Sequence, residues 1–382
     1  MSERPLHIVI AGGGTGGHLF PGVAVAQEFA ARRPGSRILF VSTGTEFERK
    51  VLDRANFQLS PITVEGLKKR GILNQIRAVV KLPVSVWESW RILSAFKPDL
   101  VLSVGSYAAG PVGLSAWLMG IPLVLHEQNI LPGITNRILS RFARRIYVSF
   151  PDSRTHFDPE KTRVSGNPIR REFIDMVSAP SDRSVAQDNR PFTVLILGGS
   201  QGAHSINMAV KDALPHLGQL QRFAFIHQTG HRDEAEVKEA YESARITGTV
   251  KSFFNDMADR YAAADLIVCR AGATTVAEVT VLGKPVIFIP FPYAADDHQA
   301  LNARNLQQAG AADMILEKDL SGSVLAEKIS GYAASPERLD RMAGRSREFG
   351  RPDAARIIVE DCCRLINAQH REVNSAIPHN ME

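Results

Sequence analysis

The sequence predicts an α/β protein built from two doubly wound, Rossmann-like domains, and three observations support this prediction. Short apolar runs alternate with longer helix-compatible stretches along the whole chain. The pattern starts afresh after residue 190, and both halves open with an apolar run that leads into a glycine-rich turn. The length of 382 residues exceeds what one typical core needs and suits two. We therefore expect two parallel sheets, each covered by helices on both faces.

Nine apolar runs are predicted to be strands, because they are apolar on both faces, as strands of a covered parallel sheet must be. In the first half they are LHIVIAG (6–12), RILFVST (37–43), LVLSV (100–104), IPLVLHE (121–127) and RIYVSF (145–150). In the second half they are FTVLILGG (192–199), FAFIHQTG (223–230), DLIVCRAG (265–272) and KPVIFIPFP (284–292). Helix-compatible sequence follows most of these runs, which is the order of a βαβ protein.

Residues 100–125 hold no charged residue, and their length alone would permit a membrane-spanning helix. Glycines and prolines divide the stretch into short pieces, however. Pro111 suits the first turn of a helix, and Gly120 suits the end of that helix. We therefore predict a strand, a loop, a helix and a second strand here instead of a membrane span.

The domain boundaries follow from composition. The first domain is predicted to cover residues 1–167, and the second to cover residues 191–351. The intervening residues 168–190 are polar, with Pro180 and several Ser, Asp and Asn residues, which is typical of a linker. Near the C-terminus, GRPDAARIIVEDCCRLINA (350–368) has the pattern of an amphipathic helix.

The bulk composition, with 44% hydrophobic and 22% charged residues, is that of a soluble globular protein. The net charge of +5 is unevenly distributed: residues 1–190 hold 25 Lys and Arg against 16 Asp and Glu, and residues 191–382 hold 20 against 24. A basic first half indicates an anionic partner.

The three cysteines lack disulfide or metal spacing, which favours a reducing, cytosolic compartment. The first apolar run is too short for a signal peptide.

The first glycine-rich turn, AGGGTGGHLFPG (11–22), lies between a strand candidate and a helix, where backbone N–H groups typically bind phosphate. Its Gly12, Gly14 and Gly17 have the spacing of a dinucleotide-binding loop. A nicotinamide site would also place an acidic residue at the end of the second strand, but that strand ends near Ser42 without one. A dehydrogenase is therefore the weaker hypothesis.

A second turn, GGSQGAHSIN (198–207), occupies the equivalent place in the second half and is not a Walker A sequence. Three further polar clusters also follow strand candidates: HEQN (126–129), RAGATTVAE (270–278) and DDHQALNAR (296–304). Because the carboxyl ends of parallel strands meet at one edge of a sheet, we expect the clusters to gather there. The carboxylate of Glu278 suits the two hydroxyls of a ribose.

The chain resembles the MurG family of bacterial transferases, in glycosyltransferase family 28, through seven motifs: GGGTGGHLFPGVAVA, GSYAAGP, LHEQN, GNPIR, GGSQGAHSIN, DMADRYAAADLIVCRAGATTVAE and DDHQALNAR. The motifs run in the family's order from about residue 8 to about residue 310. The resemblance implies a glycosyltransferase-B fold, with two domains facing across a cleft and a C-terminal helix (about 352–370) packed on the first domain. It also implies transfer of N-acetylglucosamine (GlcNAc) from UDP-GlcNAc to the 4-hydroxyl of undecaprenyl-pyrophosphoryl-MurNAc-pentapeptide, with inversion, in peptidoglycan synthesis.

The resemblance further implies which residues contact UDP-GlcNAc. They are Thr15, Gly16, Gly17, Asn129, Arg170, Ser200, Phe254, Ala273, Thr274, Thr275, Val276, Ala277, Glu278 and Gln299. Arg170 and Ser200 are expected at the diphosphate, and Glu278 at the ribose. Gln299 and Asn129 are expected at the sugar hydroxyls or the acetamido group.

The implied reaction needs a base for the incoming hydroxyl and stabilisation of the departing UDP. His18 is the first candidate base, because imidazole titrates near working pH; orienting the acceptor or capping the helix is its alternative role. Glu127 is the second candidate. The helix N-terminus after the second turn and Arg170 would stabilise the diphosphate. No cluster has metal-ligand spacing, so neither a metal nor another cofactor is expected.

Residues 66–93 are predicted to contact an anionic membrane surface. They interleave Lys68, Lys69, Arg70, Arg77 and Lys81 with Ile72, Leu73, Ile76, Val79, Val80, Leu82, Trp87 and Trp90. Basic residues beside apolar and Trp residues are typical of such surfaces, so we expect peripheral attachment to the cytoplasmic side of the inner membrane and no nucleic-acid partner.

The alternatives to the implied transferase function are another UDP-sugar enzyme of the same fold, namely a glycolipid synthase or a UDP-GlcNAc 2-epimerase, and a non-catalytic nucleotide-sugar sensor.

Overall fold

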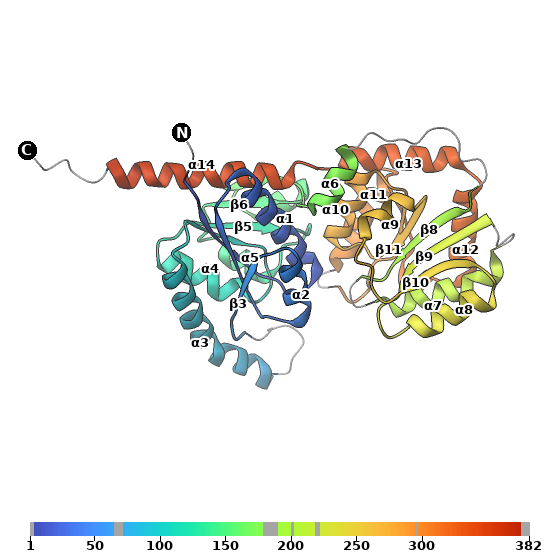
Figure 1. The fold of residues 1–382 in the computed structure, drawn as a ribbon, viewed down its shortest axis with the longest axis horizontal. Coiled ribbons are helices and arrows are strands. Elements are labelled where there is room, and N and C mark those ends of the chain that lie inside the picture. Colours follow the sequence, from blue (N-terminus) through green and yellow to red (C-terminus); the bar gives the residue numbers. More distant parts are fainter. Residues whose placement is uncertain are drawn as a thin grey trace, which may run out of the picture. The chain divides into compact units, whose positions relative to one another are not determined.

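The structure, a computed structural model, describes residues 4–64, 72–178, 190–199, 202–217, 222–294 and 297–375. The chain divides into two compact units (Figure 1). The first unit comprises Met1–Arg171 and Arg351–Glu382, and the second comprises Glu172–Gly350. The C-terminal segment therefore belongs to the same unit as the N-terminus.

The first unit is built on a parallel sheet with the strand order β3-β2-β1-β4-β5-β6-β7. Its strands are β1 (His7–Ala11), β2 (Arg37–Ser42), β3 (Gln58–Pro61), β4 (Leu100–Ser103), β5 (Leu123–Glu127), β6 (Arg145–Val148) and β7 (Thr162–Val164). Its helices are α1 (Gly16–Arg32), α2 (Glu46–Arg54), α3 (Ile72–Phe96), α4 (Ala109–Leu118), α5 (Ile134–Leu139), the 3-10 turn η1 (Pro151–His156) and α14 (Ala354–Ser375). The chain reverses its direction across the sheet between β1 and β4, which is where open α/β sheets bind ligands.

The second unit repeats this architecture with the strand order β10-β9-β8-β11-β12-β13, also parallel throughout. Its strands are β8 (Phe192–Leu197), β9 (Phe223–Gln228), β10 (Thr247–Lys251), β11 (Leu266–Cys269), β12 (Val286–Phe288) and β13 (Asp313–Met314). Its helices are α7 (His204–Ala213), α8 (Glu234–Ser243), α9 (Met257–Ala263), α10 (Ala273–Leu282), α11 (His298–Gln308), α12 (Gly322–Ala333) and α13 (Pro336–Phe349), with the 3-10 turns η2 (Leu214–His216) and η5 (Glu317–Asp319). Helix α6 (Arg171–Ser178) begins at the boundary of the two units. The reversal of direction lies between β8 and β11.

All nine predicted strands are present, which confirms the predicted fold class. The sequence did not predict β3, β7, β10 and β13, and these are the four edge strands of the two sheets. An edge strand pairs on one side only and is therefore short or polar, so it lacks the continuous apolar run of a central strand. The polar, largely exposed β10 is an example.

The uncharged stretch of residues 100–125 forms β4, α4 and β5 in succession, as predicted. Helix α4 ends at Leu118, and Gly120 has a φ of +71°, the left-handed backbone that glycine adopts most easily. No helix within the described ranges combines the length and the apolar character that crossing a bilayer requires.

The sheet of the first unit has an apolar core on each face. Ile8 and Ile10 of β1 belong to one core, together with residues of α1 and α14. Val9 and Ala11 belong to the other, together with residues of α3 and α4. The alternation of side chains along a strand divides β1 between the two cores, which explains why the whole run is apolar.

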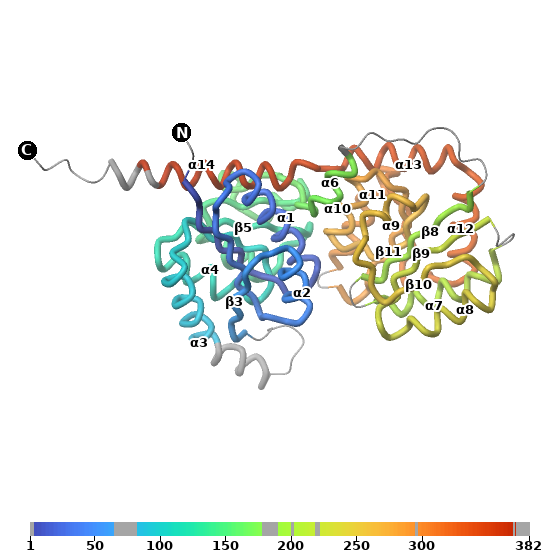
Figure 2. Tube along the Cα trace, in the orientation of Figure 1, coloured from blue at the N-terminus to red at the C-terminus, as the bar shows by residue number. Residues whose placement is uncertain are grey.

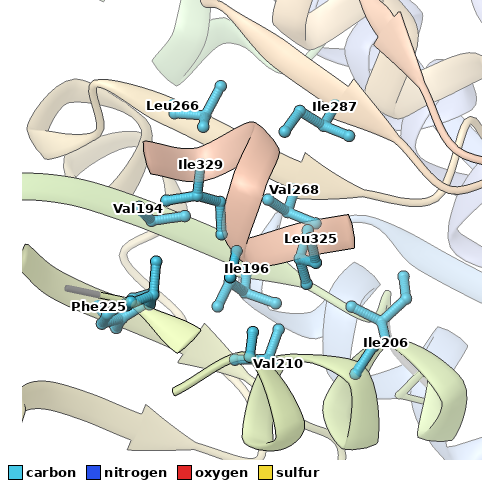
Figure 3. Close-up of a cluster of buried hydrophobic side chains, with 14 of the residues drawn as sticks. Val194, Ile196, Ile206, Val210, Phe225, Leu266, Val268, Ile287, Leu325 and Ile329 are labelled. Carbon is cyan, nitrogen blue, oxygen red and sulfur yellow. The ribbon is translucent and has the colours of Figure 1, made fainter. Parts of the chain in front are cut away.

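One core of the second unit packs helices α7 and α12 against the sheet (Figure 3). Val194 and Ile196 of β8 lie in this core with Ile206 and Val210 of α7 and Leu325 of α12. Each of these side chains is at most 1% exposed. Each glycine-rich turn therefore follows a central strand that is packed in an apolar core. β1 contributes side chains to a core on each face of its sheet, and β8 contributes side chains to the core with α7 and α12.

The C-terminal helix α14 lies beside α1 in the first unit (Figure 2). Asp361 of α14 accepts a hydrogen bond from the Tyr147 hydroxyl at 2.9 Å and pairs with Arg145 Nε at 3.0 Å. Both partners come from β6. The aspartate is only 5% exposed, so this polar contact attaches the helix to the sheet from within the fold.

Candidate functional site

The polar clusters predicted from the sequence lie where the central strands of each sheet end. In the first unit they follow β1 and β5, and in the second they follow β8, β11 and β12. All strands of a sheet run in parallel, so the clusters within one unit share the carboxyl edge of that sheet. The topology therefore assembles one set of candidate residues in each unit.

The loops after β1 and β4 touch each other at the switch point of the first sheet. Gly12 has a φ of +125°, and a Cβ added to it would lie 2.2 Å from the Gly105 carbonyl oxygen. Only glycine fits this contact. The neighbouring Gly13 N–H donates to Ser106 Oγ at 3.2 Å, so one amide of the glycine-rich turn is used within the protein.

A buried carboxylate, that of Glu48 in α2, holds the same turn. Its Oε1 accepts from the Gly14 N–H at 2.6 Å and from the Ser42 hydroxyl, and its Oε2 accepts from the Thr45 N–H at 2.7 Å. Burial alone would raise the pKa of Glu48, but these hydrogen bonds and one from Thr43 outweigh burial and lower the pKa. The ionised carboxylate opposes phosphate binding beside it. Two amides of the turn are thus engaged within the protein, and phosphate binding by the turn stays a prediction.

His18 lies in the first turn of α1 and is half-buried. Its Nδ1 is 3.0 Å from the Val104 carbonyl oxygen and 3.2 Å from Gln128 Oε1. A carbonyl oxygen can only accept, so Nδ1 carries the proton and donates. Nε2 of the neutral ring then holds a lone pair, as a general base requires. A Cβ on Gly105 would lie 3.3 Å from the ring, so glycine leaves the imidazole its space.

The second candidate base, Glu127, ends β5 and is 2% exposed. Its Oε1 accepts from the Asn129 N–H at 3.0 Å. Its Oε2 accepts from the Gly133 N–H at 3.1 Å and from Asn136 Nδ2 at 2.9 Å. A carboxylate engaged through both oxygens shapes the loop that carries Asn129. The geometry thus favours His18 over Glu127 for removing a proton from an acceptor.

Arg170 stacks on an aromatic ring of α1. Its guanidinium carbon lies 4.6 Å from the centroid of the Phe20 ring, a cation–π contact. Thr15 is the N-cap residue of the same helix, and Gly16 and Gly17 are its first two residues. Within the first unit, the guanidinium is therefore held against the helix whose N-terminus carries these three residues.

The second glycine-rich turn connects β8 to α7. Its Ser200, expected at the diphosphate, lies outside the described residues. Gly202 has a φ of +77°, and a Cβ there would lie 2.3 Å from the Thr229 carbonyl oxygen, so this position requires glycine. His204, the first residue of α7, places Nδ1 3.0 Å from both carboxylate oxygens of the buried Asp233. This pair holds the start of the helix.

The stretch Ala273–Glu278 forms the beginning of α10, directly after β11. Gly272 is the N-cap residue of this helix. Glu278 is 5% exposed, and its Oε2 accepts a hydrogen bond from the Tyr261 hydroxyl at 3.2 Å. The buried hydroxyl of α9 fixes the orientation of the carboxylate expected at the ribose.

Phe254 and Gln299 both lie in or beside loops at the same edge of the second sheet. The Phe254 N–H donates to Gln228 Oε1 at 3.0 Å, and Gln228 Nε2 donates to the Gly199 carbonyl at 3.1 Å. Gln228 thereby joins the loop after β10, where the resemblance places a backbone contact with uracil, to the second glycine-rich turn. Gln299 Oε1 accepts from the Phe291 N–H at 3.0 Å, which holds the loop after β12.

Comparison with known families matches both halves of the chain. Residues 8–148 match the glycosyltransferase family 28 N-terminal domain, and residues 193–358 match the glycosyltransferase family 28 C-terminal domain. The chain belongs to glycosyltransferase family 28. The resemblance that the sequence motifs indicated is confirmed.

Curated relatives in family 28 match over nearly their full length. The chain is 45% identical over 362 residues to the "UDP-N-acetylglucosamine--N-acetylmuramyl-(pentapeptide) pyrophosphoryl-undecaprenol N-acetylglucosamine transferase" of Anaeromyxobacter dehalogenans (strain 2CP-C), covering 94% of this chain and 93% of that protein. It is 46% identical to the protein of the same name from Syntrophus aciditrophicus (strain SB), covering 94% and 99%.

Solved structures agree with these sequence matches. The crystal structure of MurG from Acinetobacter baumannii is similar with a TM-score of 0.74 and 32% identity, covering 94% of this chain and 100% of that one. A UDP-GlcNAc 2-epimerase from Neisseria meningitidis, bound to UDP-GlcNAc, has a TM-score of 0.66 at 16% identity, covering 95% and 100%. The second likeness shows a shared fold alone.

Two residues that position candidate site groups were not predicted from the sequence: Glu48 binds the first glycine-rich turn, and Gln128 contacts His18. Glu48 had a recognisable signal, because Thr45 and Glu48 have the spacing of a capping box and form one at the start of α2. Gln128 had none, since nothing in the HEQN motif indicates which way an amide points.

Among the described residues, no group of three or more His, Cys, Asp or Glu side chains is arranged to hold a metal ion. That no metal is required stays a prediction.

Proposed function

We propose that this chain transfers GlcNAc from UDP-GlcNAc to the 4-hydroxyl of undecaprenyl-pyrophosphoryl-MurNAc-pentapeptide, with inversion at the anomeric carbon. The observation that carries the proposal is 45–46% identity, over 94% of the chain, to transferases named for this reaction. The product completes the lipid-linked disaccharide of peptidoglycan. The hydrogen bonds of His18 Nδ1 support this side chain as the candidate for the base that such a reaction needs.

In the proposed mechanism, His18 Nε2 takes the proton from the acceptor hydroxyl as its oxygen attacks the anomeric carbon. The bond from that carbon to the UDP oxygen breaks, and its electron pair leaves with the diphosphate. Nδ1 continues to donate to the Val104 carbonyl, which stabilises the imidazolium that forms. In the second unit, the N-terminus of α7 would favour the departing diphosphate through its helix dipole.

Release of UDP with and without the lipid-linked muramoyl acceptor tests the proposed reaction. We expect UDP to appear only when both donor and acceptor are present. Isomerisation of UDP-GlcNAc without acceptor would instead indicate the 2-epimerase that shares this fold. Tight UDP-GlcNAc binding without turnover on any acceptor would indicate a sensor, and nicotinamide binding would indicate a dehydrogenase.

We expect Glu278→Ala to weaken UDP binding by about 1–3 kcal/mol, because a charge-assisted pair of hydrogen bonds to the ribose is lost. Isothermal titration calorimetry with UDP measures this change. Glu337→Ala, an exposed carboxylate in the first turn of α13, is the matched control and should bind UDP as the wild type does. Unchanged UDP affinity of the Glu278 variant would remove this residue from the donor site.

We further propose that helices α3, α4 and α5 carry the surface that contacts an anionic membrane, on the cytoplasmic face of the inner membrane. Helix α4 packs against both α3 and α5. Their exposed apolar residues include Leu82, Val84, Trp87, Trp90, Trp117, Leu118, Ile134 and Ile138. The guanidinium of Arg91 lies 4.8 Å from the Trp87 ring, and Arg137 and Arg141 belong to or follow α5. Apolar and Trp residues mixed with arginines suit the interface of an anionic bilayer.

Part of the predicted membrane segment is not described by the structure. Lys68, Lys69 and Arg70 lie outside the described residues, and so do the side chains of residues 72–81. These include Ile72, Leu73, Ile76, Arg77, Val79, Val80 and Lys81. The membrane proposal therefore depends on the C-terminal part of α3 and on α4 and α5.

We expect the double variant Trp87→Ser/Trp90→Ser to bind vesicles of anionic phospholipid at least about tenfold more weakly, since two aromatic side chains no longer enter the interface. Co-sedimentation with the vesicles measures the binding. Tyr293→Ser removes a more exposed aromatic residue from the second unit and should leave vesicle binding unchanged. Equal binding by the tryptophan variant and the wild type would contradict the assignment of this surface.

A further inference from the structure

A chain of three side chains joins the loop after β7 to His18. His126 Nε2 lies 3.3 Å from the Gly166 carbonyl oxygen. Gln128 Nε2 lies 3.2 Å from His126 Nδ1, and Gln128 Oε1 lies 3.2 Å from His18 Nδ1. The chain lies wholly within the first unit and ends on the candidate base.

The direction of every hydrogen bond in this chain follows from two backbone carbonyls, which can only accept. The Val104 carbonyl lies 2.9 Å from Gln128 Nε2 and 3.0 Å from His18 Nδ1, so both nitrogens donate to it. The Gly166 carbonyl requires a proton on His126 Nε2. His126 Nδ1 is then a lone pair, which accepts the second amide proton of Gln128. Gln128 Oε1 is left to accept from His18 Nδ1.

The two supporting side chains are rigid and uncharged. His126 and Gln128 are each 1% exposed. Burial lowers the pKa of His126 to about 4, with a smaller contribution from the nearby His18, so the imidazole is neutral at physiological pH. A buried, neutral pair with all its protons assigned has one stable arrangement.

We propose that Gln128 is a positioning residue, which together with His126 holds the His18 imidazole so that its Nε2 lone pair faces the acceptor hydroxyl. This inference rests on the proposed role of His18 as the base. Gln128 does not touch the substrate; it acts through the ring that it orients. An amide in this position sets the tautomer without placing a second charge beside the imidazole, unlike the carboxylate of a Ser-His-Asp triad.

Kinetics of Gln128→Met, alone and with His18→Ala, test the inference. We expect Gln128→Met to lower kcat about 10- to 100-fold through loss of orientation and to change KM for UDP-GlcNAc less than twofold. In the His18→Ala background the same substitution should cost less than threefold, because the ring that it orients is absent. Gln369→Met, at the opposite edge of the sheet near Asp99, is the control for the chemical change and should retain wild-type activity.

The tautomers themselves provide a measurement that does not depend on activity. Long-range ¹H–¹⁵N correlation spectra of the wild-type protein at neutral pH should show His18 protonated at Nδ1 and His126 protonated at Nε2.

Two results would overturn the inference. One is His18 protonated at Nε2 in the wild-type spectra, and the other is a full loss from Gln128→Met in the His18→Ala background. If His18→Ala alone retains activity within threefold, the base assignment fails, whereas the spectra still decide the hydrogen-bond chain. Should Gln128→Met not fold, the wild-type spectra remain sufficient to reject the arrangement.

Discussion

His18→Ala lowers turnover by about two to four orders of magnitude, because the acceptor hydroxyl then has no group to receive its proton in the transition state. The structure supports this expectation through the tautomer of the ring: Nδ1 donates to the Val104 carbonyl, and Nε2 is the lone pair. Steady-state release of UDP, with saturating donor and acceptor, measures the effect. Affinity for UDP should remain close to the wild-type value, since no UDP contact is assigned to this side chain.

The alternative roles of His18 make distinct predictions. If the imidazole only orients the acceptor, its loss raises KM for the acceptor more than it lowers kcat. If it only stabilises the start of α1, the unfolding midpoint falls while turnover per folded molecule is retained. A loss of turnover below threefold would contradict the role of general base.

Glu48→Ala should lower the free energy of unfolding by about 3 kcal/mol, the second large effect that we expect. The carboxylate accepts from the Gly14 N–H, the Ser42 hydroxyl and the Thr45 N–H, and it is fully buried. Its removal leaves the buried Ser42 hydroxyl without this acceptor and takes a charged partner from the Gly14 and Thr45 N–H groups, which costs more than the bonds themselves contribute. Urea unfolding at pH 7 measures the change.

Glu46→Ala is the matched control for this experiment, because it removes a carboxylate from the same helix. The Glu46 side chain is 81% exposed and pairs with Lys50 at 2.6 Å across one helical turn. Exposed pairs contribute little, so this control should stay within about 0.5 kcal/mol of the wild type. Equal stability of the two variants would show that the carboxylate of Glu48 does not hold the glycine-rich turn.

The same residue makes stability depend on pH. Burial alone would raise the pKa of Glu48, but the hydrogen bonds that it accepts lower the pKa below its value in the unfolded chain. Such a group stabilises the fold above its unfolded pKa of about 4.3, and the contribution is lost as the pH falls through the folded value. The stability difference between wild type and Glu48→Ala should therefore narrow between pH 7 and about pH 3. A constant difference would contradict this linkage.

The sequence predicted most of the fold because the central strands of covered parallel sheets are apolar on both faces. β1, β4 and β8 are examples, and their boundaries agree with the predicted runs within a few residues. The edge strands escaped prediction, because pairing on one side leaves short or polar sequences such as β10 without a distinctive pattern. The predicted helix near the C-terminus is present as α14, and Asp361 attaches it to Tyr147 and Arg145 of β6.

The candidate site could be predicted in part. Because parallel strands end at a common edge, the glycine-rich turns and the polar clusters were expected there, and within each unit the structure brings them to that edge. The function of individual polar groups could not be inferred in this way. Gly12, Gly14 and Gly17 suggested a phosphate-binding turn, but no pattern indicated that the amides of Gly13 and Gly14 donate to Ser106 and Glu48. Similarly, Glu127 accepts from two N–H groups of the loop that follows it and from the Asn136 side chain of α5.

The sequence by itself determined the two-unit α/β architecture, the sheet edge at which the candidate residues gather and the membership of family 28. These properties follow from the hydrophobic periodicity, the placement of glycines and the order of the motifs. All three can be read from neighbouring residues or from their order along the chain. Only the tertiary structure decided which nitrogen of His18 is the lone pair, which amides are already engaged and which carboxylates hold loops. Those properties depend on hydrogen bonds between residues far apart, 34 positions for Glu48 and Gly14 and 110 for His18 and Gln128. No local pattern records the direction of a hydrogen bond between such distant groups.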